Sequence, residues 1–182
     1  MANLEKALDR TLHWEGGHGH HKNDAGGETY KGIARAYNRR WTGWPIIDSY
    51  AHLSRRRFAL ALKNNEELQA LVLKRYRERY WAPIRGDDIR HQAKADVLFD
   101  TAVLFGPHRA VTWAQYIVGA DIDGKMGPQT LGLIAKIKPE PFCSRLAWRR
   151  AEHHAERVKK DRDQGDFIHG WIRRCRAFAN AI

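Results

Sequence analysis

The chain has 182 residues, 43% of them hydrophobic, so it can bury the core of one ordinary domain, and disorder over most of its length is not expected. Its 32 lysines and arginines against 21 aspartates and glutamates give a net charge of +11, which favours an anionic partner: nucleic acid, a phosphate-rich membrane or a carboxylate-bearing wall polymer. The longest apolar runs are far shorter than the roughly 18 residues that span a bilayer, which excludes a transmembrane protein and predicts a soluble one.

The N-terminal segment predicts a helix rather than a signal peptide. Glu5 and Asp9 interrupt the apolar core that a signal peptide needs, so we expect export to depend on another protein. Apolar residues recur at helical spacing over residues 4–12, and the pair Gly16-Gly17 should end this helix. Glu15 is therefore expected at its C-terminal edge.

The rest of the chain is predicted to be mainly helical. Residues 16–29 are rich in Gly, His, Asn and Asp, which favours a loop or a short hairpin. A short helix is expected over 32–40, and residues 41–50, which contain Gly and Pro, are expected to be a connection. Capping residues, prolines and apolar periodicity predict further helices over about 54–63, 65–81, 87–105, 108–118, 128–137, 142–160 and 166–180.

These elements contain no internal repeat, no low-complexity linker and no strong strand pattern, so we expect one compact helical unit or two intimately packed lobes. Cys143 and Cys175 would lie about nine residues out of register in the last helical pair, about 13 Å apart and too far for a disulfide. Both are expected to be reduced. Four tryptophans are interpreted as core residues: Trp41, Trp44, Trp113 and Trp171. Three basic runs are interpreted as solvated helix faces: Arg55–Arg57, Arg149-Arg150 and Arg173-Arg174.

The segment 14–33 concentrates acidic groups, a hydroxyl and glycines. Glycoside hydrolysis needs one carboxylic acid that protonates the leaving oxygen and a second group that holds water or stabilises the cationic sugar, and Glu15 and Asp24 could form this pair. Partial burial at a helix end would raise the pKa of Glu15 towards that of a general acid, whereas Asp24 in a glycine-rich loop would stay ionised. Thr29 could orient a water molecule.

This segment also resembles a known family. The order Glu15-Gly16-Gly17, Asp24-x-Gly26-Gly27-x-Thr29 and Gly32-Ile33 resembles the signature of glycoside hydrolase family 108, the lysozyme-like N-acetylmuramidases that include phage endolysins. The resemblance implies an all-α, lysozyme-like fold with at most a small hairpin in the active-site loop. Phe99–Val103 and Asp123–Thr130 resemble the C-terminal part of that family, a predicted peptidoglycan-binding region. We therefore expect a catalytic part over 1–86 and a helical, wall-binding part over 87–182, packed as one unit.

The resemblance implies hydrolysis of the β-1,4 bond between N-acetylmuramic acid and N-acetylglucosamine. Glu15 would protonate the leaving oxygen, and either Asp24 or Thr29 would position the water. The stereochemical outcome is open. We expect no cofactor and no metal, because His13, His18, His20 and His21 match no zinc motif and are interpreted as solvated. Further substrate contacts are predicted at Gly27, Tyr30, Asp100 and Gln115.

The expected partner is bacterial peptidoglycan, with the basic surface available to an anionic outer envelope. We expect a monomer that is made in the bacterial cytoplasm without a signal peptide and reaches the wall in the periplasm through a holin, and we expect no nucleic-acid partner. Two alternatives are a non-catalytic wall-binding or secretion-accessory protein and a basic nucleic-acid-binding protein. The second predicts affinity with a steep salt dependence and no release of sugar fragments.

Overall fold

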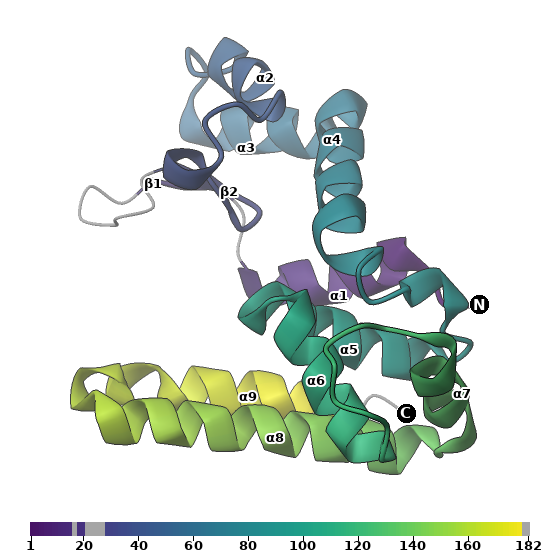
Figure 1. Ribbon diagram of the computed structural model, residues 1–182. Coiled ribbons are helices and arrows are strands. Elements are labelled where there is room, and N and C mark those ends of the chain that lie inside the picture. Colours follow the sequence, from purple (N-terminus) through teal and green to yellow (C-terminus); the bar gives the residue numbers. More distant parts are fainter. Residues whose placement is uncertain (16–17, 21–27, 180–182) are drawn as a thin grey trace. The chain divides into compact units, whose positions relative to one another are not determined.

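The computed structural model describes residues 1–15, 18–20 and 28–179 (Figure 1). The chain forms two compact units, one of residues 8–77 and one of residues 1–7 and 78–182. The predicted mainly helical fold with a small hairpin is confirmed. The predicted division into a catalytic part over 1–86 and a wall-binding part over 87–182, packed as one unit, stays a prediction.

Residues 8–77 combine short helices with a small antiparallel sheet. Helix α1, Leu4–Glu15, ends at the residue that the sequence predicted. The remaining elements of this unit are β1 (His18–His20), β2 (Glu28–Tyr30), β3 (Ile33–Ala34), the 3-10 turn η1 (Arg35–Tyr37), α2 (Gly43–Ser49), α3 (Arg55–Asn64) and α4 (Glu66–Tyr76). Strand β2 lies between β1 and β3.

The structure corrects the prediction of a helix over 32–40. Thr29 pairs with Ala34 and Tyr30 with Ile33, so the two residues between them form a tight hairpin turn. Lys31 and Gly32 both have positive φ, 46° and 77°, which is the backbone of the turn that matches the twist of paired strands. Because Ile33 and Ala34 belong to β3, only the short 3-10 turn η1 follows them.

Residues 41–50 are also corrected, since they contain helix α2 rather than a connection. Pro45 is the third residue of α2, within the first turn, where backbone N–H groups have no partner inside the helix and proline is tolerated. Gly43 is required by packing: a Cβ there would lie 2.4 Å from the ring of Trp41. Helix α4 begins at a true cap, because Asn65 Oδ1 accepts a 2.7 Å hydrogen bond from the N–H of Leu68.

The other unit is a helical bundle built around α5, Gln92–Phe105. Residues 93–102 are all buried, and α5 packs against α6 (Pro107–Val118), α8 (Pro139–Lys160) and α9 (Ile168–Ala179). The predicted start near residue 87 is wrong, because a 3-10 turn, η3 (Gly86–Asp88), precedes α5. The unit also contains the π-helical turn η2 (Arg77–Trp81), α7 (Pro128–Lys136) and the 3-10 segment η4 (Arg162–Phe167).

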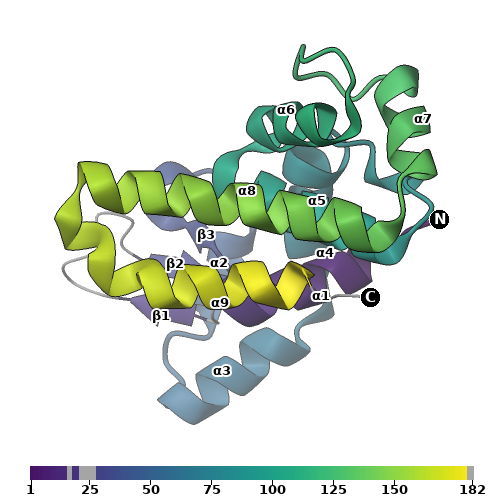
Figure 2. The same cartoon turned by 90° about the horizontal axis from the view of Figure 1, so that it is seen from below.

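Helices α8 and α9 run side by side as an antiparallel pair (Figure 2). Proline in the first turn begins α6, α7 and α8. The sequence predicted this for α7, whereas α8 begins three residues before the predicted start at residue 142. Cys143 and Cys175 are buried and unpaired, which confirms that no disulfide joins them. Among the described helices, none is long and apolar enough to cross a membrane.

Candidate active site

Three residues were predicted to carry the chemistry, and the structure describes two of them. Glu15 is the last residue of α1, immediately before the glycine pair. Thr29 is the central residue of β2. Asp24 lies outside the described residues, as does the predicted substrate contact Gly27.

Thr29 lies between two small residues on the sheet. Its partners across the sheet are Gly19 on β1 and Ala34 on β3, two of the smallest residues. Successive side chains of a strand point to opposite faces, so Thr29 lies on the face opposite that of Tyr30. Its side chain is half-buried, and neither residue in register with it is bulky.

The opposite face of β2 is fixed to helices α3 and α4 by Tyr30, which is buried. The phenol of Tyr30 donates a 3.3 Å hydrogen bond to the carbonyl of Leu62. The amide of Gln69 donates to the same carbonyl at 2.6 Å and to the Tyr30 oxygen at 3.0 Å. Burial raises the pKa of Tyr30, against a smaller lowering by the Gln69 hydrogen bond, so the phenol stays a neutral donor.

The turn after β2 is held by the same helix. Lys31 donates to Gln69 Oε1 at 2.5 Å, and the hydroxyl of Tyr76 donates to the carbonyl of Lys31 at 2.7 Å. Desolvation lowers the pKa of the Lys31 ammonium. Together with the Tyr30 bonds, these contacts fix the hairpin that presents Thr29.

An ion-pair cluster continues from the sheet towards α2. Arg35 Nε lies 2.5 Å from the carboxylate of Glu28 on β2, and its Nη2 lies 2.5 Å from Asp48 on α2. The hydrogen bond from Arg35 lowers the pKa of Asp48, and the same bond is the main cause that raises the pKa of Arg35. The guanidinium stacks over Trp44 at 4.4 Å, so one arginine joins β2 to α2.

Two predicted substrate contacts, Asp100 and Gln115, belong to the helical bundle. Asp100 is fully buried on α5, and its carboxylate pairs with Arg150 at 2.6 Å and Arg174 at 2.7 Å. Gln115 is 1% exposed, accepts from the N–H of Gly124 at 2.9 Å and donates to Asp123 at 2.7 Å. These partners give both side chains structural roles, and their contact with substrate stays a prediction.

Sequence reasoning missed the residues that position the hairpin. These residues are Gln69, Tyr76 and Arg35. They belong to ordinary amphipathic or polar stretches of the sequence, and their spacing does not link them to Thr29. The histidine interpretation is not tested, because His21 lies outside the described residues. Among the residues that the structure does describe, no group of His, Cys, Asp and Glu is arranged to hold a metal ion.

Comparison with models of protein families identifies the family of this chain. The family model described as glycosyl hydrolase 108 matches residues 8–106, more than half of the sequence. The chain belongs to the glycosyl hydrolase 108 family. A second family model, described as a predicted peptidoglycan domain, matches residues 109–176. This glycosyl hydrolase 108 protein is therefore a glycoside hydrolase that acts on peptidoglycan.

A solved structure, that of Brucella abortus SagA, is similar over nearly the whole glycosyl hydrolase 108 chain. The two are 26% identical, with a TM-score of 0.61, and the match covers 97% of this chain and 95% of the SagA chain. A search of curated proteins found no match. The segment matched to glycosyl hydrolase 108 contains Glu15, Asp24 and Thr29, and the segment matched to the peptidoglycan domain contains Gln115.

Proposed function

We propose that this glycoside hydrolase is an N-acetylmuramidase, which hydrolyses the β-1,4 bond between N-acetylmuramic acid and N-acetylglucosamine. The observation that carries the proposal is the placement of Glu15 at the end of a helix, directly before the glycine pair, within the segment matched to the family. A carboxyl group at the start of a glycine-rich segment can meet a bulky sugar closely. Glu15 then serves as the acid that protonates the leaving oxygen.

The second half of the reaction needs a group that holds the attacking water. A threonine hydroxyl can orient water but is far too weak a base to take its proton, so we assign that proton to Asp24 and the orientation to Thr29. The small neighbours Gly19 and Ala34 support this role, because they leave space beside Thr29. If the carboxyl groups of Glu15 and Asp24 lie roughly 6.5–9.5 Å apart, a water fits between acid and base and the anomeric configuration inverts.

We further propose that the protein is an endolysin of a phage or prophage, made in the cytoplasm and released to the wall in the periplasm by a holin. The net charge of +11 supports this setting, since it would hold the enzyme against an anionic envelope. The test is lysis of cells that express the protein with or without a holin. Equal lysis in both cultures contradicts the need for a holin.

The identity of the cleaved bond is tested by digesting purified sacculi, reducing the products with borohydride and measuring the masses of the released fragments by mass spectrometry. A muramidase leaves reducible N-acetylmuramic acid ends. Reducible N-acetylglucosamine ends would instead show a glucosaminidase, and unreducible ends lighter by one water would show an intramolecular transfer; either result contradicts the proposal. Binding without released fragments would point to a wall-binding protein.

A further inference from the structure

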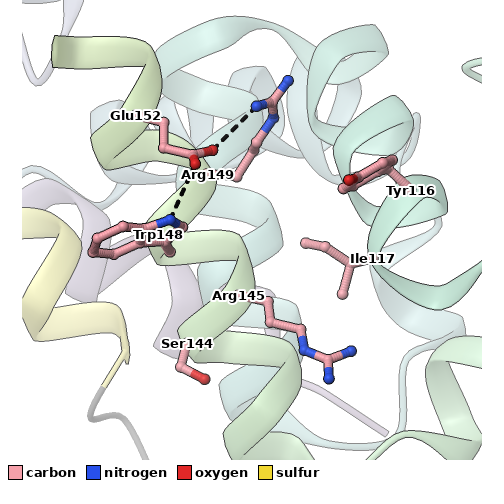
Figure 3. Close-up of a pocket in the computed structure, with 7 residues that line it drawn as sticks. All are labelled: Tyr116, Ile117, Ser144, Arg145, Trp148, Arg149 and Glu152. Atoms are coloured by element: carbon pink, nitrogen blue, oxygen red, sulfur yellow. Dashed lines mark hydrogen bonds and ion pairs between the residues drawn. The ribbon is translucent and has the colours of Figure 1, made fainter.

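A groove lies between helices α6 and α8, in the segment matched to the peptidoglycan domain (Figure 3). Its volume is about 700 Å³. Every lining residue falls within residues 109–176, and none of them was predicted as a binding residue: Tyr116, Ile117, Ser144, Arg145, Trp148, Arg149 and Glu152.

Two large aromatic side chains line this α6–α8 groove and face solvent. Tyr116 and Trp148 are each 69% exposed. Their exposure is not a consequence of a missing core, because the other face of α8 is buried through Phe142, Leu146 and Arg150. Exposed aromatic rings gathered at one groove are typical of binding surfaces, since each ring offers an apolar face and a polar edge.

The polar groups of the groove are arranged around Glu152. Its carboxylate accepts 3.1 Å hydrogen bonds from the indole of Trp148 and from Arg149, which fixes both side chains. The Arg149 guanidinium lies 6.0 Å from the ring of Tyr116. Among the described residues, Arg145 has no carboxylate partner, and its guanidinium extends into the groove (Figure 3). The lining therefore carries an excess of positive charge.

We propose that the α6–α8 groove is the site that binds the peptidoglycan strand. Trp148 and Tyr116 pack against the sugar rings, and Arg145 binds a carboxylate that the strand carries on its peptide or on its lactyl group. Guanidinium groups bind carboxylates with charge-assisted hydrogen bonds, which suits an anionic amino-sugar polymer. This inference rests on the proposed function, because it takes the substrate of the enzyme as the occupant of the groove.

The test measures binding separately from hydrolysis. Glu15→Gln protein is co-sedimented with purified sacculi, and Trp148→Ala or Arg145→Ala is added to that background. We expect each addition to weaken binding about tenfold, as residues at the centre of a binding site do. Two matched controls lie outside the groove: Phe167→Ala changes an exposed aromatic residue, and Arg173→Ala changes an exposed arginine of α9. We expect each control to change the affinity for sacculi less than twofold. Trp148→Phe should restore most of the affinity that Trp148→Ala loses.

The charge is tested on the wall itself. Amidating the carboxylates of the sacculi should weaken binding of the parent protein about as much as Arg145→Ala does, and should weaken the Arg145→Ala protein little further. Two soluble fragments distinguish the peptide carboxylates from the lactyl carboxylate: a disaccharide-peptide, made with another muramidase, and the peptide-free disaccharide. Tighter binding of the first indicates that Arg145 binds a peptide carboxylate, and tighter binding of the second indicates the lactyl carboxylate. The probe is the indole N–H resonance of Trp148, identified by its loss in Trp148→Phe.

The proposal that the α6–α8 groove binds the strand is refuted if Trp148→Ala and Arg145→Ala both leave binding unchanged. It is also refuted if the control variants lose as much affinity as these two do. Failure of the groove and failure of the proposed function give different results. If the wild-type protein releases muropeptides and the groove variants bind sacculi as the Glu15→Gln parent does, only the assignment of the groove as the binding site is refuted. Groove-dependent binding by a protein that releases no muropeptides refutes only the hydrolysis.

Discussion

Replacing Asp100 with Asn should strongly destabilise the helical bundle. The carboxylate is fully buried and is bound by Arg150, itself 0% exposed, and by Arg174, which is 8% exposed. Among the described residues, Nε and Nη1 of Arg150 have no hydrogen-bond partner, so its charge depends on Asp100 and on the nearby ring of Phe178 at 5.3 Å. Asn keeps the shape but removes the negative charge that pairs with both guanidinium groups.

Breaking a buried ion pair on one side costs about 3–5 kcal/mol. Asp100→Asn breaks the pairs with both Arg150 and Arg174, so we place it at the upper end of that range. For a chain of this size, such a loss lowers the melting temperature by about 10 °C or more. The assay is urea unfolding followed by circular dichroism. An apolar replacement of the whole triad, Asp100→Leu with Arg150→Met and Arg174→Leu, should recover most of the loss.

A loss below about 1 kcal/mol in Asp100→Asn would refute this reasoning. So would a triple variant that is no more stable than the single one. The same variant tests the predicted substrate contact. If Asp100 binds the wall directly, Asp100→Asn lowers the affinity for sacculi while the unfolding free energy stays unchanged.

Three further predictions concern the hairpin and the bundle. Thr29→Val should lower the rate of sacculus hydrolysis about 100-fold with unchanged unfolding, whereas Thr29→Ser should keep most of it; equal rates in the two variants would remove the hydroxyl from the mechanism. Gln69→Ala should lower the unfolding free energy by about 2 kcal/mol, because it removes donors to Tyr30 and Leu62 and the acceptor of Lys31, and thermal melts with no shift would contradict this role. Burial, with smaller effects of Arg150, His153, Arg157 and Arg174, lowers the pKa of His154 to about 4. The unfolded chain takes up this proton near pH 6.5 and the folded chain only near pH 4, so up to about 3 kcal/mol of stability is lost as pH falls through that window. His154→Phe, which keeps a ring beside Trp171, should lose less between pH 7 and 4 in urea titrations; the same loss in both proteins would show that His154 is not responsible.

Local signals predicted several helix ends, including the end of α1 at the candidate acid Glu15. The pair Gly16-Gly17 predicted the end of α1 at Glu15, and Pro128 predicted the start of α7. Pro139 was expected to precede a helix over 142–160, but it is the first residue of α8. Helix α2 was missed because Gly43 and Pro45 break helices in general, while here the packing of Trp41 on Gly43 and the early position of Pro45 permit one. Strand β3 was missed because its pairing depends on a turn with positive φ at Lys31, a residue that rarely adopts it.

The groove was missed for a different physical reason. The pair Arg149-Arg150 was interpreted as one solvated face, but the helical period places Arg150 with the buried residues and Arg149 with Trp148 on the exposed face. Four residues of α8 recur with that period: Arg145, Trp148, Arg149 and Glu152. A polar face with one aromatic residue resembles ordinary solvated surface until the structure brings Tyr116 of α6 beside it.

The central claim is that Glu15 is the proton donor of a muramidase. The most direct measurement compares the release of reducible N-acetylmuramic acid ends from sacculi by the wild-type protein, by Glu15→Gln and by Glu5→Gln, which changes an exposed glutamate in the first turn of the same helix. We predict that Glu15→Gln loses at least 100-fold in rate while Glu5→Gln matches wild type and all three bind sacculi equally. Equal release by wild type and Glu15→Gln would contradict the account.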